Sequence, residues 1–509
     1  MSAQNALGKL AKSAGVVFFG TILARALALA GEAIIIRSLA PDAFGQVALA
    51  YTVALTVSQF ALLGVPNGVT RLLSTERTRE EELDVLRSGF LIVLTGATVV
   101  ALAVFVFRSE IAALMNEGGI GPLLALFVPF ILVTPIGKVA VAVLRARGRS
   151  ARAILSKNIG PRVGALSLFA LLALAGEPFY GAVAFWVAIP VVTVCSALFF
   201  TRRELSLSAT VRRLPDGKTV RELWSFSWPL AISASFLLFL SNLDVLMVGY
   251  FLNSTAVGYY RSVMPLRQVT KFVLLAFRFL FLPLATKYYD AERFDELDEL
   301  YTISTKWTVA ATLPPVLVIS LFSPTIVRFL FGAEYLPGAP VLTVLTLGLF
   351  FVAAVGPTGP MIQAIDRPRA ESVSAAAGFV TNAALNVLLI PRLGIIGAAV
   401  ATVAGYAVYN SVEVAVIYRE TSTHPFSLDS LKPIIPTTVV GLCLLWLTAD
   451  YTLGLGALAG ISVVLSLTQV VSMIATRSLD SADLFLIEQV EGRIGLDLTW
   501  LKATIRSQS

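Results

Sequence analysis

Four basic side chains lie within one apolar stretch of the sequence and are its strongest chemical signal. Residues 255–286 are rich in Phe, Leu and Val but contain Arg261, Arg267, Lys271 and Arg278. In a continuous helix, where successive residues are rotated by about 100°, the last three lie within about 40° of one another and form a cationic stripe. A charge inside a membrane is costly unless it faces a cavity or a partner. We therefore expect the stripe to bind an anion.

The composition predicts an all-α membrane protein. The chain has 509 residues, of which 57% are hydrophobic and 14% charged, and its mean hydropathy is +0.81. A soluble chain would carry about 25% charged residues. The predicted spans are 14–37, 45–71, 88–107, 121–144, 152–175, 179–201, 224–251, 255–286, 303–322, 338–364, 370–390, 393–418, 432–449 and 453–475. We therefore expect about fourteen transmembrane helices.

The loop charges predict the orientation of these spans. An even number of spans places both termini on one side, and the loops on that side carry most of the loop Arg and Lys residues. The opposite loops offer little beyond Arg108, Arg328 and Arg392. Because cytoplasmic loops are enriched in Lys and Arg, we expect a multi-pass protein of the cell (cytoplasmic) membrane with both termini in the cytoplasm. The same asymmetry accounts for the net charge of +7, so nucleic acid is not an expected partner.

An internal repeat predicts the domain organisation. The segment that begins at Arg79 matches the segment that begins at Arg293, 214 residues later, and four further short matches occur at offsets of 213 to 218. Two parallel, pseudo-symmetric six-helix lobes would bind substrate between them and rock for alternating access. The predicted parts are an N-terminal lobe at 1–201, a basic cytoplasmic linker at 202–223, a C-terminal lobe at 224–418, two appended transmembrane helices at 419–480 and a cytoplasmic amphipathic tail at 481–509.

Acidic residues in the outer part of two spans are candidates for counter-charge or ion coupling. Glu32 lies seven residues after Arg25 on the same helix face, so an ion pair between them is an alternative to anion binding by Arg25. Glu32 and Asp244 occupy nearly equivalent positions of the repeat. They can pair with the basic residues, or they can bind a coupling Na⁺ or H⁺ with Asn242 supplying a further oxygen.

The sequence does not favour catalysis or a metal centre. His424 is the single histidine, and Cys195 and Cys443 both lie in apolar segments. No loop is long enough to form a catalytic domain. We therefore expect no enzyme activity, no catalytic or metal-binding residue, and no cofactor other than a coupling Na⁺ or H⁺.

Four segments of the chain resemble one transporter family. They are Arg37–Gly45, Leu243–Tyr260, Phe331–Tyr335 and Asn386–Ala399. In these segments the chain is similar to the polysaccharide transporter (Wzx-type) flippases of lipid-linked oligosaccharides, within the multidrug/oligosaccharidyl-lipid/polysaccharide exporter superfamily. The resemblance implies two six-helix lobes around a cationic cavity that opens to one side at a time. It also implies a cargo of sugar or oligosaccharide on a polyprenyl or dolichyl (pyro)phosphate.

The charges in the spans fit such a cargo, because Arg binds phosphate well. We expect Arg25, Arg267 and Lys271 to bind the phosphate and Arg278 to lie at the inward entrance, while the lipid tail stays in the bilayer. Transport would run from the cytoplasmic to the outer leaflet and serve surface polysaccharide or protein glycosylation. The expected partners are the lipid-linked glycan, membrane lipids and glycosyltransferases of the same pathway.

Two alternatives belong to other functional classes. A cation-coupled small-molecule or multidrug exporter of the same superfamily should line its cavity with carboxylates, whereas bases outnumber acids deep in these spans. A membrane glycosyltransferase would need a catalytic acidic motif in a sizeable loop, and the loops here are short.

Overall fold

The structure is a computed structural model, and it describes most of the chain. It describes residues 20, 21, 23–75, 77–201, 213–480, 483, 484 and 502. Within that range it describes the backbone but not the side chains at 150, 229–230, 232–235, 237, 268–273 and 275–280. The predicted linker therefore lies outside the described residues up to residue 212, and so does nearly all of the predicted tail.

The described residues confirm the predicted fold class. Every regular element that they form is a helix, and each predicted span, as far as it is described, coincides with one helix or with consecutive helices. Nine of these helices are long and apolar enough to cross a membrane, or ten if α14 (Phe294–Leu321) and α15 (Ser323–Phe331), bent by 75°, form one span. The protein is a multi-pass helical membrane protein.

The chain forms two compact units. The first comprises Met1–Pro265 and Asn386–Ala398, and the second comprises Leu266–Leu385 and Ala399–Ser509. The division between two six-helix lobes, which the repeat places at 202–223, stays a prediction.

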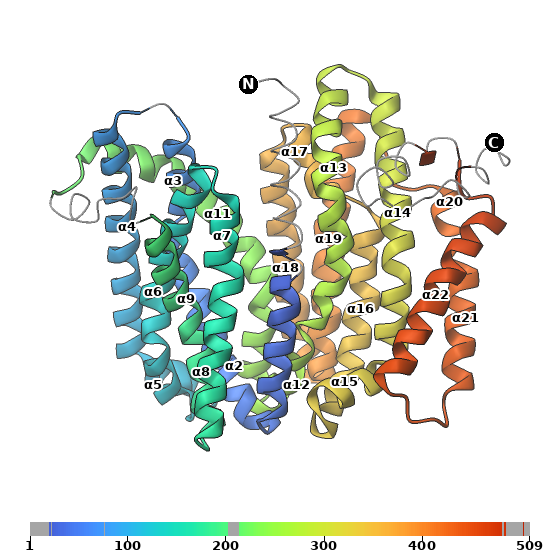
Figure 1. Cartoon of the computed structure of the whole chain (residues 1–509), viewed down its shortest axis with the longest axis horizontal. Coiled ribbons are helices and arrows are strands. Elements are labelled where there is room, and N and C mark those ends of the chain that lie inside the picture. The colour runs from blue at the N-terminus through green and yellow to red at the C-terminus, as the bar shows by residue number, and fades with distance from the viewer. Residues whose placement is uncertain are drawn as a thin grey trace. The chain divides into compact units, whose positions relative to one another are not determined.

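The first unit is built around α6, which packs against α2, α3, α4 and α9 (Figure 1). After a helical segment at 23–37, its elements are α2 (Pro41–Leu62), α3 (Val65–Leu73), α4 (Arg79–Val106), α5 (Arg108–Leu114), α6 (Ile120–Ala146), α7 (Ser150–Ile154), the π-helical turn η1 (Leu155–Ile159), α8 (Gly160–Leu174), α9 (Pro178–Thr201), α11 (Gly217–Phe251) and α12 (Ser254–Val263). Glycines bring α2 and α12 together, because a Cβ on Gly45 would overlap the Ser254 carbonyl oxygen and one on Gly258 that of Pro41.

In the second unit, α14 packs against α13, α16 and α22 (Figure 1). The further elements in chain order are the 3₁₀ turn η2 (Leu266–Val269), α13 (Thr270–Asp290), η3 (Ala333–Gly338), α16 (Ala339–Ala354), α17 (Thr358–Ala364), α18 (Pro368–Leu393), α19 (Ile395–Thr421), α20 (Leu428–Leu431), α21 (Ile434–Leu447) and α22 (Leu455–Ala475). Residues 386–398, at the end of α18 and the start of α19, belong to the first unit.

Several predicted spans are broken helices, and the breaks have local causes. The break between α2 and α3 lies at Leu63 and Gly64, whose φ angles are 49° and 72°. The break between α16 and α17 contains Gly356, with a φ of 71°. Pro265 lies in the break between α12 and η2, and its missing N–H and its restriction of the preceding residue both oppose a continuous helix.

Candidate functional site

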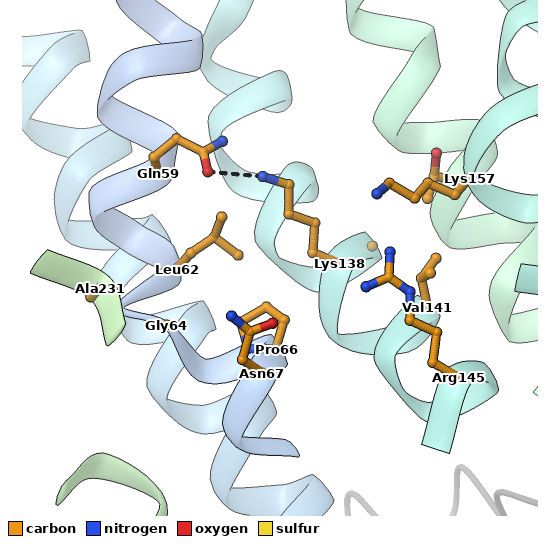
Figure 2. Close-up of a pocket in the computed structure, with 12 residues that line it drawn as sticks. Gln59, Leu62, Gly64, Pro66, Asn67, Lys138, Val141, Arg145, Lys157 and Ala231 are labelled. Carbon is orange, nitrogen blue, oxygen red and sulfur yellow. Dashed lines mark hydrogen bonds between the residues drawn. The ribbon is translucent and has the colours of Figure 1, made fainter. Parts of the chain in front are cut away.

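A cavity of about 260 Å³ with both polar and apolar walls lies among the helices of the first unit. Figure 2 shows three basic side chains that line it: Lys138 and Arg145 from α6 and Lys157 from η1. Gln59 from α2 lies opposite Lys138, whose Nζ donates a hydrogen bond to the Gln59 amide oxygen at 2.9 Å. Asn67 from the first turn of α3 adds another neutral polar group. Because α3 starts at this wall, the positive end of its dipole adds to the cationic character of the cavity.

A second cavity, of about 530 Å³, adjoins the first. Arg145 and Lys157 line both, and the second adds Arg25 from the first helix and Arg162 from α8. Arg162 donates a hydrogen bond of 2.7 Å to the backbone oxygen of Asn158, a neutral acceptor. We call these two cavities together the cationic cavity.

Local helix geometry brings the basic side chains to this place. Lys138 and Arg145 are seven residues apart, so two turns of α6 present them on one face. Lys157 lies in the π-helical turn that precedes α8. Such wide turns shift the helix face by a fraction of a turn and are frequent at functional sites.

The electrostatics of the cationic cavity favour an anion. Five basic side chains line it, and no carboxylate is among its lining residues in the described part of the chain. Lys157 lies close enough to Arg145 and Arg162 to be repelled by both. Like charges gathered in a low-dielectric environment raise the affinity for a ligand of opposite charge.

The predicted acidic residues contact protein groups of the first unit. A nitrogen of Arg261 lies 3.3 Å from a carboxylate oxygen of Glu32, so Glu32 has a basic partner. Asp244 is fully buried and accepts a hydrogen bond of 2.6 Å from the Tyr260 hydroxyl. Asn242 donates a hydrogen bond to the backbone oxygen of Leu238 at 3.0 Å. These contacts give Glu32 and Asp244 structural partners, and their role in ion coupling stays a prediction.

The predicted cationic stripe is interrupted. Arg267 lies in η2, where successive residues are rotated by about 120° rather than 100°, so the geometry of one continuous helix does not apply to it. Its side chain is 7% exposed. Lys271 and Arg278 share one side of α13 by their spacing, but their side chains lie outside those that the structure describes. Of the four predicted phosphate-binding residues, the structure places Arg25 in the cationic cavity.

The other residues of the cationic cavity were not predicted as phosphate ligands. In the sequence, Lys138 and Arg162 are charges within predicted spans. This feature could have identified them as candidate phosphate ligands. Arg145 lies among loop arginines, and such arginines indicate the orientation of the spans in the membrane rather than a binding site. Lys157 lies near the end of a predicted span, where a lysine can reach water.

A helical membrane protein with broken spans and a cationic cavity is typical of transporters for anionic molecules. A model of the polysaccharide biosynthesis protein family matches residues 10–288, more than half of the chain, and the protein belongs to this family. A second family model, MatE, matches residues 229–388. The predicted family resemblance is confirmed.

Two relatives match at the level of sequence. The probable low-salt glycan biosynthesis flippase Agl15 of Haloferax volcanii is 25% identical over 399 residues, which cover 78% of this chain and 81% of that protein. An uncharacterized membrane protein of Methanocaldococcus jannaschii is 27% identical over 190 residues, which cover 37% of this chain and 38% of that protein.

The fold also resembles a solved transporter. The lipid II flippase MurJ, in an inward closed conformation, aligns with a TM-score of 0.71 and 14% identity. The alignment covers 89% of this chain and 97% of the MurJ chain. At 14% identity, the similarity to MurJ is a similarity of fold.

Proposed function

We propose that this protein is a flippase that moves a lipid-linked sugar or oligosaccharide from the cytoplasmic to the outer leaflet by alternating access. The glycan is carried on a polyprenyl or dolichyl (pyro)phosphate. The observation that carries the proposal is the cationic cavity, which has five basic residues and no carboxylate among its described lining residues. Membership of a polysaccharide biosynthesis family and the flippase relative from Haloferax volcanii support the same class.

The basic residues have a direct task in this mechanism. Arg145 and Lys157, which line both cavities, hold the (pyro)phosphate, and Arg25, Lys138 and Arg162 complete its cationic surroundings. Neutral groups such as Gln59, Asn67 and Thr193 offer hydrogen bonds to sugar hydroxyls. The lipid tail stays in the bilayer, because moving it into a polar cavity would forfeit its apolar surroundings.

The proposal includes the cell membrane as the site of action, with both termini in the cytoplasm, as the loop charges favour. The partners are then membrane lipids and the cytoplasmic glycosyltransferases that build the glycan. Transport changes no covalent bond of the cargo, so the protein acts as a carrier and not as an enzyme.

The match to the MatE model favours a second candidate, a small-molecule exporter of the same superfamily. A cavity that recognises cationic drugs needs negative charge, because like charges repel at close range. The described charged side chains that line the cationic cavity are all positive. We therefore place the exporter second.

Binding of an anionic glycolipid tests the proposal. Purified protein should bind a polyprenyl diphosphate-linked sugar and should not bind the matching neutral polyprenyl glycoside. Because a hydrogen bond to a charged group contributes about 1.5–3 kcal/mol, Arg145→Gln or Lys157→Gln should each weaken binding by about 10- to 100-fold.

Arg147→Gln is a matched control, because Arg147 is two residues from Arg145, is outside the cavity lining and bonds Glu82 at 2.6 Å. Equal affinity for the anionic and the neutral glycolipid would contradict the proposal. Preferential binding of a cationic dye would favour the exporter.

A further inference from the structure

A buried carboxylate in the second unit has no task in the cationic cavity. The Glu413 side chain on α19 is fully buried, and no described basic side chain bonds its carboxylate oxygens, which face two neutral hydroxyl groups. An ionised carboxylate in such a place has lost its water shell, and neutral hydroxyl groups compensate only part of that loss. Glu413 therefore needs a proton or a counter-ion.

Neutral oxygen-bearing groups surround Glu413. The hydroxyl groups of Thr358 on α17 and Tyr409 on α19 face the carboxylate. Asn410 lies three residues before Glu413 and therefore on the same face of α19. The Thr358 hydroxyl donates a hydrogen bond of 3.3 Å to the Asn410 side-chain oxygen, which joins α17 to α19 beside Glu413.

A helix break lies at the same site. α16 ends at Ala354 and α17 begins at Thr358, so the backbone around Gly356 is non-helical. The carbonyl oxygen of Val355 is released from the helical pattern and accepts a hydrogen bond of 3.0 Å from the Tyr301 hydroxyl. Broken helices, whose carbonyl oxygens are released from the helical hydrogen-bond pattern, are a common way for membrane transporters to hold a small cation.

Among the side chains that the structure describes, the other titratable groups near Glu413 cannot neutralise it. They are Tyr301 on α14, Tyr409 on α19 itself and Glu371 on α18. One turn beyond Glu413, Ile417 belongs to an apolar cluster that also contains Tyr301 and Met361 of α17. Two phenols, a second carboxylate and apolar side chains supply no positive charge.

We propose that Glu413 binds a monovalent inorganic cation, either a proton or Na⁺. The bound cation neutralises the carboxylate and allows it to stay buried beside the break between α16 and α17. When the cation leaves, the charge must reach water, and the packing around Glu413 must loosen. The binding step is independent of the cargo, whereas a role of this cation in driving transport rests on the proposed flippase function.

Thermal unfolding of the purified full chain in detergent tests the proposal without any transport substrate. The Tm is measured from mildly acidic to mildly alkaline pH, in NaCl and in choline chloride at equal ionic strength. A Tm that falls as the pH rises in choline chloride identifies a proton as the ligand, and a Tm that NaCl raises at constant pH identifies Na⁺. In Glu413→Gln, which mimics the neutralised side chain, the response seen in the wild type should disappear.

The matched control is Glu420→Gln, because Glu420 lies on the same helix but is partly exposed and pairs with Arg367 at 2.7 Å. This variant should keep the wild-type response. A wild type that responds to neither pH nor Na⁺ would overturn the proposal, as would a Glu413→Gln variant that responds like the wild type.

Labelling of the wild type by dicyclohexylcarbodiimide covers the case in which Glu413→Gln fails to fold. This apolar reagent modifies protonated buried carboxyl groups, and mass spectrometry locates the modified residue. Glu413 should be labelled faster at lower pH, and Na⁺ should protect it if Na⁺ is the ligand. Absence of labelling at Glu413 at every pH, together with a Tm that does not respond to Na⁺, would contradict the proposal.

Discussion

At the scale of single residues, the contact between Glu32 and Arg261 can be tested as an ion pair. Their side chains are 18% and 14% exposed, so both charges are largely removed from water. Arg261→Met should lower the free energy of unfolding by about 3 kcal/mol, because it leaves Glu32 buried without its partner. The double variant Glu32→Gln/Arg261→Met should recover most of this loss, which a double-mutant cycle of thermal unfolding would measure. Strictly additive losses would show that the two residues do not stabilise each other.

The residues of the cationic cavity show how far a sequence can predict such a site. Arg25 could be identified because a charge deep in an apolar span is unusual in itself. Lys157 could not, because its place in the cavity depends on a π-helical turn that the periodicity of the sequence does not reveal. Arg145 has the sequence context of a loop arginine and becomes a cavity residue only because α6 continues to Ala146.

At the scale of helices, close crossings depend on glycine. A Cβ at Gly258 would overlap the carbonyl oxygen of Pro41, which belongs to the backbone and cannot rotate away. Gly258→Ala should therefore push α12 from α2 and cost about 1–3 kcal/mol, measured as a lower Tm.

Gly460→Ala is the control for this crossing, because a Cβ there meets no atom within 4 Å of the described chain. That variant should be neutral or more stable by about 0.5–1 kcal/mol, since alanine is the better helix former. Equal Tm values for the two alanine variants would show that the crossing tolerates a side chain.

The segment after α22 is held to α14 by a buried lysine. Lys306 is 3% exposed and its Nζ lies 2.6 Å from Asp483 and 3.2 Å from Asp480. Burial raises the pKa of Asp483, and Lys306 acts in the opposite direction. Lys306→Met removes the charge and hydrogen bond of the lysine, while the Trp307 indole N–H and the Asp480 backbone N–H still bond Asp483. Burial of the ionised carboxylate is then less well compensated, so ionised Asp483 favours the undocked segment, and docking weakens as the pH rises.

Limited proteolysis after α22 measures this docking. Cleavage of Lys306→Met should increase with pH, and adding Asp483→Asn should remove the pH dependence. Cleavage of Lys306→Met at the wild-type rate across the pH range would show that the lysine does not hold the segment.

At the scale of the whole molecule, the predicted spans agree with the helices because the length of an apolar run is a local property of the sequence. The breaks were harder to predict. The interruption at Pro265 turns the predicted helix 255–286 into three elements, and the α17 break beside Glu413 places a buried acid next to non-helical backbone. Both features depend on neighbouring helices that satisfy the released backbone groups.

The central claim is that the cationic cavity carries an anionic glycolipid across the bilayer, and a flipping measurement tests it most directly. Liposomes containing the purified protein and a fluorescent polyprenyl diphosphate-linked sugar are treated with a membrane-impermeant quencher. The wild type and the Arg147→Gln control should expose the inner-leaflet probe quickly. The Arg145→Gln/Lys157→Gln variant, with two phosphate contacts removed, should be at least about 10-fold slower. A wild type no faster than protein-free liposomes, or a double variant as fast as the wild type, would contradict the account.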